Sequence, residues 1–470
     1  MKRHILGSVL CVISLCSCTL EPDYLRPPSP VAAAWTDAAG VAASASASGA
    51  GVAAQSPAPL AADVDWHTFF QDPALQNLIA LALENNRDMR VAALKVAQYE
   101  AQYRIARSAL LPTIDATGAV DNYREIGVTT KESSVTLGET SWEVDFFGRL
   151  RSLKHQALEQ YLATDASQTS TRISLIATVA TDYFQWLTDQ SLLEVATATA
   201  EADRQTYQVN LQSERIGTAS MQDVRQAESE YASVRSSLIA DQRAVAQDFN
   251  NLVAVIGCPI PDGLLHSEAL EASQLPPMSA GVPSDLLTRR PDIVEAEHTL
   301  KAANANVGAA RAAFFPSIQL TTAAGTSSTA LSGLFKAATG AWTFAPTVTL
   351  PIFDYGNNRA TLDAAKIETQ IEVANYEKAI QTAFKEVANA LAGRATYVDQ
   401  VAADREYVAA STHYDDLAQA RYRTGTDSFL VLLDAERTLY TARQQLVNDR
   451  FAELSNLITL YKALGGGWKA

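Results

Sequence analysis

The chain has 470 residues, 47% of them hydrophobic and 19% charged, and its 52 acidic against 37 basic side chains give a formal net charge of −15. This balance argues against nucleic acid as a partner, because phosphate binding needs a basic face. After the N-terminus no apolar stretch reaches 18 residues, so a membrane protein with this sequence must use β-strands or stay peripheral.

The first residues indicate the compartment. Lys2 and Arg3 precede an apolar run at 5–15, which is shorter than the ~20 residues of a membrane-spanning helix. We therefore interpret residues 1–17 as a secretory signal that is removed from the mature protein.

A string of four residues ends this segment: Leu15-Cys16-Ser17-Cys18. It resembles a bacterial lipobox, which implies cleavage before Cys18 and attachment of lipid to its thiol. Cys16 is the rival acceptor, but Leu15 would then stand where a small residue is preferred. An ordinary signal peptide with incidental cysteines is the alternative.

The cysteine count limits the chemistry of the mature chain. Cleavage before Cys18 removes Cys11 and Cys16 and leaves Cys258 as the one free thiol. An internal disulfide framework and a metal site built on paired cysteines are then both excluded, although the compartment would allow disulfides.

Residues 18–65 are predicted to be a lipidated tether. Prolines open a spacer at 26–65, and Ala, Ser and Gly dominate 38–62, a composition that cannot bury enough apolar area to offset the entropy of ordering. We expect a flexible segment with some extended pieces, whose path the sequence does not give. Trp35 is a candidate exception that packs against another part of the protein.

From Trp66 onward the chain is a tandem repeat. Asp88 and Asp292 match at an offset of 204 residues, and Gly217 and Gly425 match at an offset of 208. Two halves of similar structure follow from this self-similarity. The predicted parts are a first repeat at 66–257, a linker at 258–283, a second repeat at 284–464 and a tail at 465–470.

Each half is predicted to contain a helix, two strands, a long helix and a returning helix. In the first half, a helix at 72–110 ends before Pro112, and alternating apolar residues place two strands within 113–147. The next 68 residues, 149–216, contain neither Gly nor Pro and therefore predict one long helix.

The second half follows the same order, with strands within 317–355 and a long helix at 357–424 in which Gly393 is the only break. On the returning helices, apolar residues recur at alternating steps of three and four, which is coiled-coil spacing. An amphipathic bundle helix is the simpler interpretation of the same pattern. In the first half, a change of parity between Leu137 and Trp142 indicates a β-bulge or a bend.

The strands predict an oligomer. Strands of about ten residues match the length that spans a hydrocarbon core, but four strands are too few to close a barrel. An open edge in lipid costs several kcal/mol for each unpaired backbone group, so the strands must pair between chains. Two copies would give eight strands with a nearly filled lumen, whereas three would give twelve and leave an aqueous channel. Three copies are therefore favoured.

Three strings of residues carry a resemblance to a known family: Arg289-Arg290-Pro291-Asp292-Ile293, Ala309-Ala310-Arg311-Ala312-Ala313-Phe314-Phe315-Pro316-Ser317-Ile318, and Tyr422-Arg423-Thr424-Gly425-Thr426 leading to Leu432-Leu433-Asp434-Ala435. The chain resembles the outer-membrane factor family, the TolC-like exit ducts of tripartite efflux pumps and of type I secretion. With the lipobox and Trp66, it is most similar to the lipoprotein (NodT/OprM-type) branch attached to multidrug pumps. The resemblance covers 66–465, and the spacer at 38–62 is longer than is usual in the family.

The resemblance implies a mainly helical fold with a membrane β-barrel part. A homotrimer would form a twelve-stranded β-barrel that continues into a twelve-helix α-barrel, so that an outer-membrane protein extends far into the periplasm. The implied partners are outer-membrane lipid, a periplasmic adaptor and an inner-membrane pump. No enzymatic activity is expected, and no cofactor apart from the covalent lipid. The substrate cannot be read, because selection in such pumps lies mostly with the inner-membrane partner.

The two long hairpins are predicted to turn at glycines, which supply the left-handed conformation of a sharp reversal. Ser220 and Asp223 are spaced as an N-cap and its reciprocal partner. The resemblance implies that these tips dock onto the adaptor, and the simpler interpretation is that they are only good turns. The candidate docking residues are Arg215, Gly217, Thr218, Arg423, Gly425 and Thr426.

An acid follows the second tip. The resemblance implies that Asp434 faces the lumen at the closed end, where three copies would form a negative ring that prefers cations. A carboxylate stabilised by the helix dipole is the alternative. The better-known family member has a second acid three residues earlier, where this chain has Val431, so an apolar constriction at Val431 is a substitute and the preference for cations stays open.

The resemblance also implies a latch between neighbouring hairpins. Asp223 matches the acid of that latch and Tyr422 matches its hydroxyl partner, and Arg421, Arg423 and Arg225 are candidates to join it. Exposed ion pairs contribute only ~0–1 kcal/mol each, so a gate held by a few of them can be opened by binding of the adaptor.

The sequence does not favour a metal site. Glu295 and His298 have the i, i+3 spacing of di-iron helix bundles, but the first half has Val91 and Leu94 at the matching positions. Surface helix residues are the better interpretation. The sequence also lacks nucleotide-binding and hydrolase motifs, so energy must come from a partner.

The sequence therefore predicts the exit duct of an efflux system, which passively conducts small molecules to the exterior. A secretion duct for polypeptides is the alternative within the same class. A structural or adhesive coiled-coil lipoprotein that transports nothing is the alternative outside it, and the paired strands at matching places in both halves argue against it.

Overall fold

A computed structural model describes residues 19–32, 60–265, 270–276, 278–279 and 285–467. The signal segment 1–17, the lipidation residue Cys18 and Trp35 lie outside the described residues, so what the sequence indicates for them stays a prediction.

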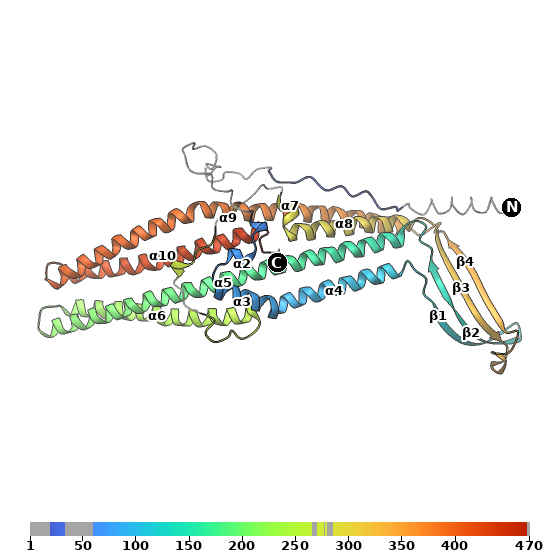
Figure 1. Cartoon of the computed structure of the whole chain (residues 1–470), viewed down its shortest axis with the longest axis horizontal. Helices are drawn as coiled ribbons and strands as arrows, with labels where there is room; N and C mark the ends of the chain where they lie inside the picture. Colours follow the sequence, from blue (N-terminus) through green and yellow to red (C-terminus); the bar gives the residue numbers. More distant parts are fainter. Residues whose placement is uncertain (1–18, 33–59, 266–269, 277, 280–284, 468–470) are drawn as a thin grey trace. The chain divides into compact units, whose positions relative to one another are not determined.

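The order of elements predicted from the sequence recurs in the two halves (Figure 1). The helices are α2 (Trp66–Phe69), α3 (Pro73–Asn85), α4 (Arg87–Ser108), α5 (Arg149–Arg215), α6 (Met221–Ile256), α7 (Leu286–Arg289), α8 (Pro291–Ala312), α9 (Asn357–Arg423) and α10 (Phe429–Ala463). The strands are β1 (Asp115–Glu125), β2 (Val128–Glu143), β3 (Ser317–Ser328) and β4 (Gly340–Thr349).

The chain forms two compact units, and each of them draws on both halves of the sequence. The first unit contains the described residues 19–28, the four strands, most of α8 and the beginnings of α5 and α9. The second unit contains α6, α10 and the remainder of the two long helices. The two repeats therefore interleave within each unit and do not form two separate domains.

The four strands form one antiparallel sheet in the order β1-β2-β3-β4. The pairing of β2 with β3 joins the two halves of the sequence, and its register shifts between Glu139 and Trp142. Ser141, inside this irregularity, has a positive φ of 77°. The bulge predicted from the change of parity is therefore confirmed.

This bulge keeps the apolar positions of all four strands on one face. Leu137 pairs with Ala324 of β3 before the bulge, and Trp142 pairs with Leu320 after it. Cross-strand partners point to the same side of a sheet, and without the extra residue Trp142 would point to the other side. The bulge thus repairs the apolar alternation that the sequence breaks.

Two strands end earlier than the alternation predicts. The pattern continues to Phe147 and Ile352, but β2 ends at Glu143 and β4 at Thr349. After β2 the chain makes one more ladder bond and then turns, because the amide of Phe146 donates to the carbonyl of Val144 at 2.8 Å. After β4, Pro351 has no amide hydrogen to extend a ladder.

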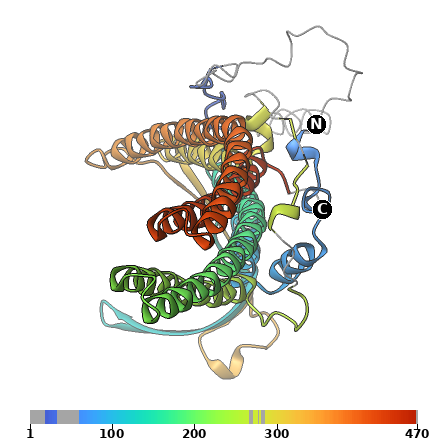
Figure 2. The ribbon, with the colours of Figure 1, turned by 90° about the vertical axis from the view of Figure 1, so that its left-hand side faces the viewer.

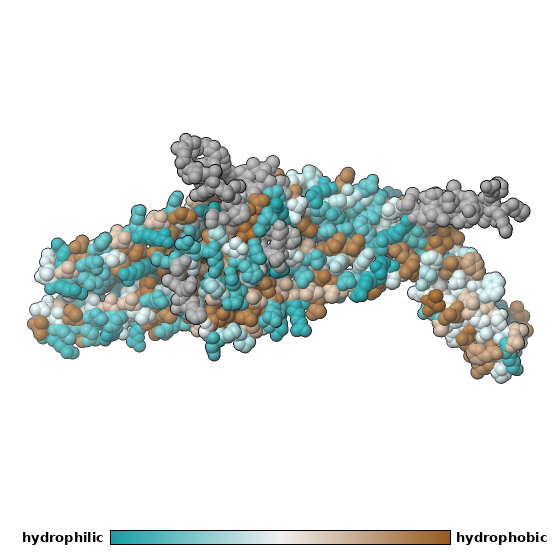
Figure 3. All heavy atoms as spheres, in the orientation of Figure 1, coloured by the Kyte–Doolittle hydropathy of each residue, from teal (hydrophilic) through white to brown (hydrophobic). Residues whose placement is uncertain are grey.

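The sheet exposes large apolar side chains. Trp342 is 79% exposed, Phe344 62%, Val348 64% and Leu137 58%, and Figure 3 shows apolar residues gathered over the strands. Exposed apolar surface on this scale marks a face that contacts lipid or another protein.

The long helices confirm the expected hairpins. α5 ends at Arg215 and α9 ends at Arg423, each within one residue of the end predicted from the sequence. Each of these long helices is followed by a returning helix. On α6, Val224, Ala227 and Val234 are buried, and they follow the alternating steps of three and four that the sequence predicts for the returning helices. The corresponding buried residues of α10 are Leu432, Ala435, Leu439 and Ala442.

Gly393 does not break α9. A Cβ at this position would lie 2.4 Å from Oδ1 of Asn456 on α10, whose side-chain amide donates to the carbonyl of Ala390 at 2.9 Å. The glycine therefore permits a close contact between the two helices of this hairpin.

The prediction of one helix at 72–110 was wrong. Asn86 leaves the helical conformation, with ψ at 135°, and separates α3 from α4. Its side chain accepts from the amide of Met89 at 3.0 Å and donates to the carbonyl of Val255 at 2.6 Å. Asn86 thus ends one helix, caps the next and ties both to the end of α6.

Both ends of the predicted tether are part of the fold. Arg26 forms an ion pair with Glu297 at 2.6 Å, and Asp63 forms one with Arg289 at 3.2 Å. Trp66 is buried at 3% exposure. No helix among the described residues is long and apolar enough to cross a membrane.

Candidate functional site

The tips of the two hairpins turn as the glycines predict. Gly217 and Gly425 have φ of +76° and +72°, and a Cβ added at either position would meet no atom within 4 Å. Left-handed backbone of this kind strains any residue with a side chain. Figure 2 looks onto the tips, which join α5 to α6 and α9 to α10. The six candidate docking residues are exposed: Arg215, Gly217, Thr218, Arg423, Gly425 and Thr426.

The two tips are secured by different side chains. At the start of α6, Ser220 accepts from the amide of Asp223 and the Asp223 carboxylate accepts from the amide of Ser220, which confirms the predicted capping box. At the start of α10 the corresponding Ser428 makes no side-chain cap. There Arg421 forms an ion pair with Asp427 across the turn, at 2.6 Å.

The structure does not bring Asp223 and Tyr422 into contact as a latch. The Asp223 carboxylate accepts from the hydroxyl of Ser220 at 2.7 Å, and the Tyr422 hydroxyl donates to Oδ1 of Asn210 at 2.9 Å. Asn210 belongs to α5 and is fully buried, so Tyr422 ties the second hairpin to the first. Burial and then the charge of Asp223 raise the pKa of Tyr422.

The arginines proposed to join the latch have other partners. Arg225 donates to Glu228 at 2.7 Å, and Arg423 donates to Gln419 at 3.3 Å. Together with the Arg421–Asp427 pair, these bonds are local to one hairpin, so none of them ties one hairpin to the other.

Further from the tips, an acid cluster joins the two hairpins. We define it as Asp203, Glu230, Glu436 and the cation Arg437. Arg437 of α10 donates to Glu230 of α6 through Nε at 2.7 Å, and the hydroxyl of Thr206 on α5 donates to Glu436 of α10 at 3.3 Å. Together with the Tyr422–Asn210 hydrogen bond, these two contacts join the first hairpin to the second.

The acid cluster contains more negative charge than its partners neutralise. Asp203 is 3% exposed, and its Oδ2 is buried without a hydrogen-bond partner. Burial, followed by the charge of Glu230, raises the pKa of Asp203 to about 7, against the effect of Arg437. Burial and then the charge of Asp203 raise the pKa of Glu436 to about 7. Ionising these carboxyls therefore costs free energy while the hairpins are packed together.

The sequence reading missed Asp203 and Asn210, but a signal for them exists. Ala196, Asp203 and Asn210 recur at steps of seven along α5 and are all buried. A polar residue at a seam position of a coiled coil marks a specific contact. The same coiled-coil spacing, applied to α5 as well as to α6, identifies both Asp203 and Asn210.

Asp434 and Val431 differ in their surroundings. Asp434 is exposed, and its Oδ2 accepts from the Tyr414 hydroxyl at 3.1 Å. Val431 is half-buried against the apolar cluster around Phe429 and Leu432. In a single chain the Asp434 side chain is therefore accessible to water, whereas the Val431 side chain packs in part against its own hairpin.

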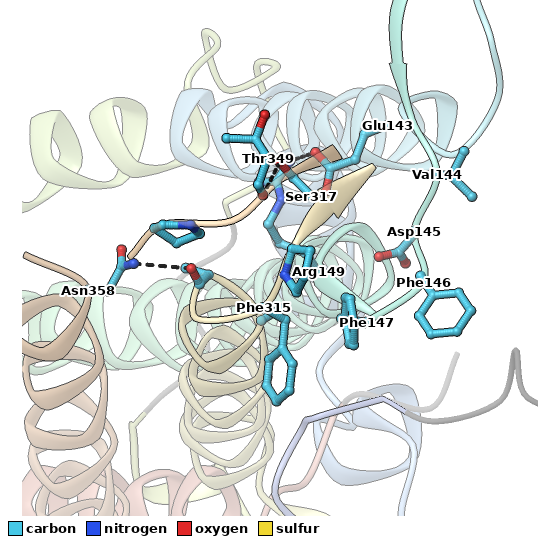
Figure 4. A pocket seen from close by; sticks show the side chains of 14 residues that line it. Glu143, Val144, Asp145, Phe146, Phe147, Arg149, Phe315, Ser317, Thr349 and Asn358 are labelled. Carbon is cyan, nitrogen blue, oxygen red and sulfur yellow. Dashed lines mark hydrogen bonds and ion pairs between the residues drawn. The ribbon is translucent and has the colours of Figure 1, made fainter. Parts of the chain in front are cut away.

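A cavity of about 280 Å³ lies where β2, β3 and β4 meet the helices of the first unit (Figure 4). Arg149 forms an ion pair with Glu143 there, and Phe147 stacks on Phe315 with ring centroids 4.7 Å apart. Asp145 accepts from the amide of Leu150 at 3.1 Å and so begins α5. Because these polar groups are paired with one another or with backbone, we interpret the cavity as a structural corner.

The pair Glu295 and His298 does not form a metal centre. His298 Nδ1 lies 2.6 Å from Glu159 Oε2, and its ring is half-buried in a network of charged groups. Among the described residues there is no group of three or more His, Cys, Asp or Glu side chains that could hold a metal ion. His298 therefore has a structural role in an ion-pair network and is more than a surface residue.

Comparisons with known proteins give consistent results over nearly the whole chain. A family model described as outer membrane efflux protein matches residues 78–258 and 282–466. The toluene efflux pump outer membrane protein TtgC of Pseudomonas putida is 46% identical over 477 residues, which cover 100% of this chain and 96% of the relative. The cation efflux system protein CusC of Escherichia coli is 40% identical and covers 97% of each chain. The open state of the Neisseria gonorrhoeae MtrE outer membrane channel superposes with a TM-score of 0.85 at 39% identity, covering 96% of this chain and 99% of that one.

Proposed function

The chain belongs to the outer membrane efflux protein family and is a non-enzymatic outer-membrane channel of an efflux pump, and from this premise we propose that it conducts small molecules as a homotrimer. The twelve strands of three copies form one closed barrel in the membrane, and their long helices form a twelve-helix barrel in the periplasm. The non-transporting structural lipoprotein considered above is thereby wrong.

The observation that carries the trimer is the four-stranded sheet. Among the described residues β1 pairs only with β2, and β4 pairs only with β3. In lipid each backbone group left unpaired on these edges would cost several kcal/mol. Copies that pair β1 of one chain with β4 of the next remove both edges, and the exposed apolar face of the sheet then contacts lipid.

The hairpin tips form the periplasmic end of the duct. The exposed residues around Gly217 and Gly425 bind the hairpin of a periplasmic adaptor, which links the channel to an inner-membrane pump. The exposed carboxylate of Asp434 contributes to a ring of three negative charges, and Val431 contributes to an apolar constriction beside it. The hydrogen bond between Tyr422 and Asn210 and the acid cluster hold the closed form.

The cargo consists of small, largely apolar molecules. The relatives are named for efflux of toluene, antibiotics and cations, and identity is higher to the toluene and antibiotic proteins, at 46%, than to the cation protein, at 40%. No relative reported above is named for secretion of polypeptides, so the structure and its relatives favour efflux over the secretion duct.

The N-terminus anchors the duct. Residues 1–17 are the signal, Cys18 carries the lipid, and 18–65 lead to the first repeat at 66–257. A linker at 258–283, the second repeat at 284–464 and the tail at 465–470 complete the chain. Mass spectrometry of the N-terminal peptide of the mature protein tests both the cleavage site and the lipid.

Two measurements on the detergent-extracted protein test the duct itself. Native mass spectrometry should give three copies, and planar bilayers should show single-channel currents. A monomer that inserts without conducting current would overturn the proposal.

A further inference from the structure

A cavity of about 190 Å³ lies between the two hairpins, near their tips. Three helices line it: α5 of the first hairpin, and α9 and α10 of the second. On α5 the wall includes Ala202, Thr206 and Val209, whose spacing places them on one face of the helix. Because both hairpins contribute to the wall, the cavity exists only while they are packed together.

Part of the wall is apolar. Leu432 of α10 is buried, whereas the Val209 side chain is 52% exposed. Tyr422 of α9 belongs to the same wall, and its hydroxyl is bonded to Asn210. An apolar or aromatic group can therefore pack against this part of the wall without displacing the contacts that join the hairpins.

One carboxylate lines the cavity, and it is poorly paired. Among the described residues, the hydrogen bond to Glu436 comes from the hydroxyl of Thr206 at 3.3 Å, which is longer than the about 2.5–3.0 Å of a good hydroxyl bond. Arg423 also lines the cavity, but it donates to Gln419. A half-buried carboxylate in such surroundings is stabilised when a positive charge lies beside it.

Other acids act on Glu436 from three neighbouring helices. They are Asp203 of α5, Glu230 of α6 and Asp415 of α9. Asp203 and Asp415 are buried, at 3% and 8% exposure, and each has a carboxylate oxygen without a hydrogen-bond partner. The nearby bases are Arg437, which donates to Glu230, and Arg443, which acts on Asp415. Even with Arg423 counted, the acids around the cavity outnumber the bases.

This excess of negative charge does not form a metal site. Among the described residues, no group of three or more His, Cys, Asp or Glu side chains could hold a metal ion. The apolar wall formed by Val209 and Leu432 also offers no ligand to a metal. An organic cation matches both parts of the cavity, because its charge can lie beside Glu436 while its carbon skeleton packs against the apolar side chains.

We propose that the cavity binds a small organic cation, with an ammonium group beside Glu436 and an apolar body against Val209, Leu432 and Tyr422. Since both hairpins form the site, the cation binds the packed form of the hairpins better than the separated form and holds them together. Binding itself needs only the packed hairpins of one chain. Its effect on the current rests on the proposed channel, which the amine would keep closed.

Fluorine NMR of 4-fluorobenzylamine with the detergent-extracted protein tests the binding. The signal of the amine should broaden, and that of 4-fluorobenzyl alcohol, which has the same ring without the charge, should not. Glu436→Gln should weaken binding of the amine roughly tenfold or more, the usual effect of losing a charged partner. Glu228→Gln, at the matching position of the first half, should bind as the wild type, because Glu228 is paired with Arg225.

Two further variants locate the site. Val209→Trp keeps every charge but fills the cavity, so it should abolish the broadening, and the exposure of Val209 makes the larger side chain compatible with folding. Asp434→Asn removes the exposed carboxylate near the tip and should still bind the amine. Binding that is lost in Asp434→Asn and kept in Glu436→Gln, or equal broadening of amine and alcohol by the wild type, would overturn the proposal.

The affinity should depend on pH, because protons compete with the cation. Burial and then the charge of Glu230 raise the pKa of Asp203 to about 7, and burial and then Asp203 raise that of Glu436 to about 7. An alkylammonium, like that of lysine, stays charged in this range. Binding should therefore tighten about tenfold from pH 6 to 8 and change little above that. An affinity independent of pH would show that the amine does not contact these carboxyls.

Currents in planar bilayers test the effect of the bound cation. At ten times its Kd and at pH 8, benzylamine should lower the ratio of open to closed channels about tenfold, and it should have no such effect on Val209→Trp. An amine that binds but leaves the wild-type current unchanged would refute the closing role. A protein that binds the amine and never conducts would instead contradict the proposed channel and support the binding site.

Discussion

The two hairpin tips have the same backbone turn, but they differ in the partners of their side chains. The first tip is closed locally, by the capping box of Ser220 and Asp223. The second hairpin reaches across to the first through Tyr422, Glu436 and Arg437. The repeat has therefore kept the turn, which every hairpin needs, whereas the side chains that join the two hairpins differ between its two copies: Asn210, Thr206 and Glu230 in the first and Tyr422, Glu436 and Arg437 in the second.

The largest effect on efflux is expected at Gly217 and Gly425, the glycines at which both tips turn. Gly217→Leu or Gly425→Leu forces a side chain into left-handed backbone and places it on the proposed adaptor surface. Resistance to exported compounds should fall to that of cells without the channel, while native mass spectrometry still finds trimers.

Gly263 offers a matched control for these substitutions. It also has a positive φ, of +78°, with open space around it, but it lies in the predicted linker between the repeats. Gly263→Leu should retain resistance. Normal resistance in both tip variants would show that the tips are only turns.

The next largest effect distinguishes between two contacts that are candidates to hold the channel closed: the Tyr422–Asn210 hydrogen bond and the Asp223–Tyr422 pair. Tyr422→Phe and Asn210→Ala each remove one hydrogen bond worth ~0.5–1.5 kcal/mol, which corresponds to a change of about 2- to 10-fold in the ratio of closed to open channels. In planar bilayers both should raise conductance, and the double variant should do no more than either single variant.

Asp223→Ala provides the comparison. It removes the carboxylate half of the α6 capping box without touching the Tyr422–Asn210 bond, so its effect should add to that of Tyr422→Phe. Strong coupling between Asp223 and Tyr422, with none between Asn210 and Tyr422, would restore the latch predicted from the family resemblance.

The acid cluster predicts a pH dependence. The pKa values of Asp203 and Glu436 are both raised to about 7 in the folded protein, first by burial. A carboxyl with a raised pKa stabilises the packed hairpins fully below its ordinary value of ~4, and this contribution is lost as the pH rises through its folded pKa. Channel opening should therefore increase between about pH 4 and 7 and level off above that range.

Charge-neutral variants test this dependence. Asp203→Asn and Glu436→Gln should flatten the pH profile of the single-channel current. Glu228→Gln, at the half-buried position that matches Glu436 in the first half, should leave it unchanged, because Glu228 is paired with Arg225. An unaltered profile in the Asp203 and Glu436 variants would exclude the cluster as its source.

The smallest effect is expected at the exposed pair of the second tip. Arg421→Ala removes the ion pair with Asp427, in which the Arg421 side chain is 56% exposed, and exposed pairs contribute little because water screens them. Conductance and thermal stability should stay close to the wild type. A marked loss of stability would mean that this pair is shielded from water in the assembled protein.

Most of the fold could be predicted from local patterns. The absence of Gly and Pro fixed the extent of α5, the alternation of apolar residues located the strands, and the parity change at Leu137 and Trp142 located the bulge. Asn86 could not be predicted in this way, because the contact that favours a break there involves Val255, far away in the sequence.

The site was predictable only in part for the same reason. Gly217, Gly425 and the Ser220 cap are determined by neighbouring residues, so spacing was enough to find them. Tyr422 and Asn210 are 212 residues apart, and the choice between Asn210 and Asp223 as its partner depends on how the helices pack. Asp203 becomes significant only through its burial, which its identity alone does not reveal.

The pairing of β2 with β3 has a consequence for how the protein matures. Ser133 pairs with Ser328, so the two strands that meet at the centre of the sheet are made far apart in time, with the whole first hairpin between them. Contacts of such long sequence separation form slowly. Until β3 arrives, the first strand pair is an unfinished apolar ribbon, and the cell must shield it from aggregation during export.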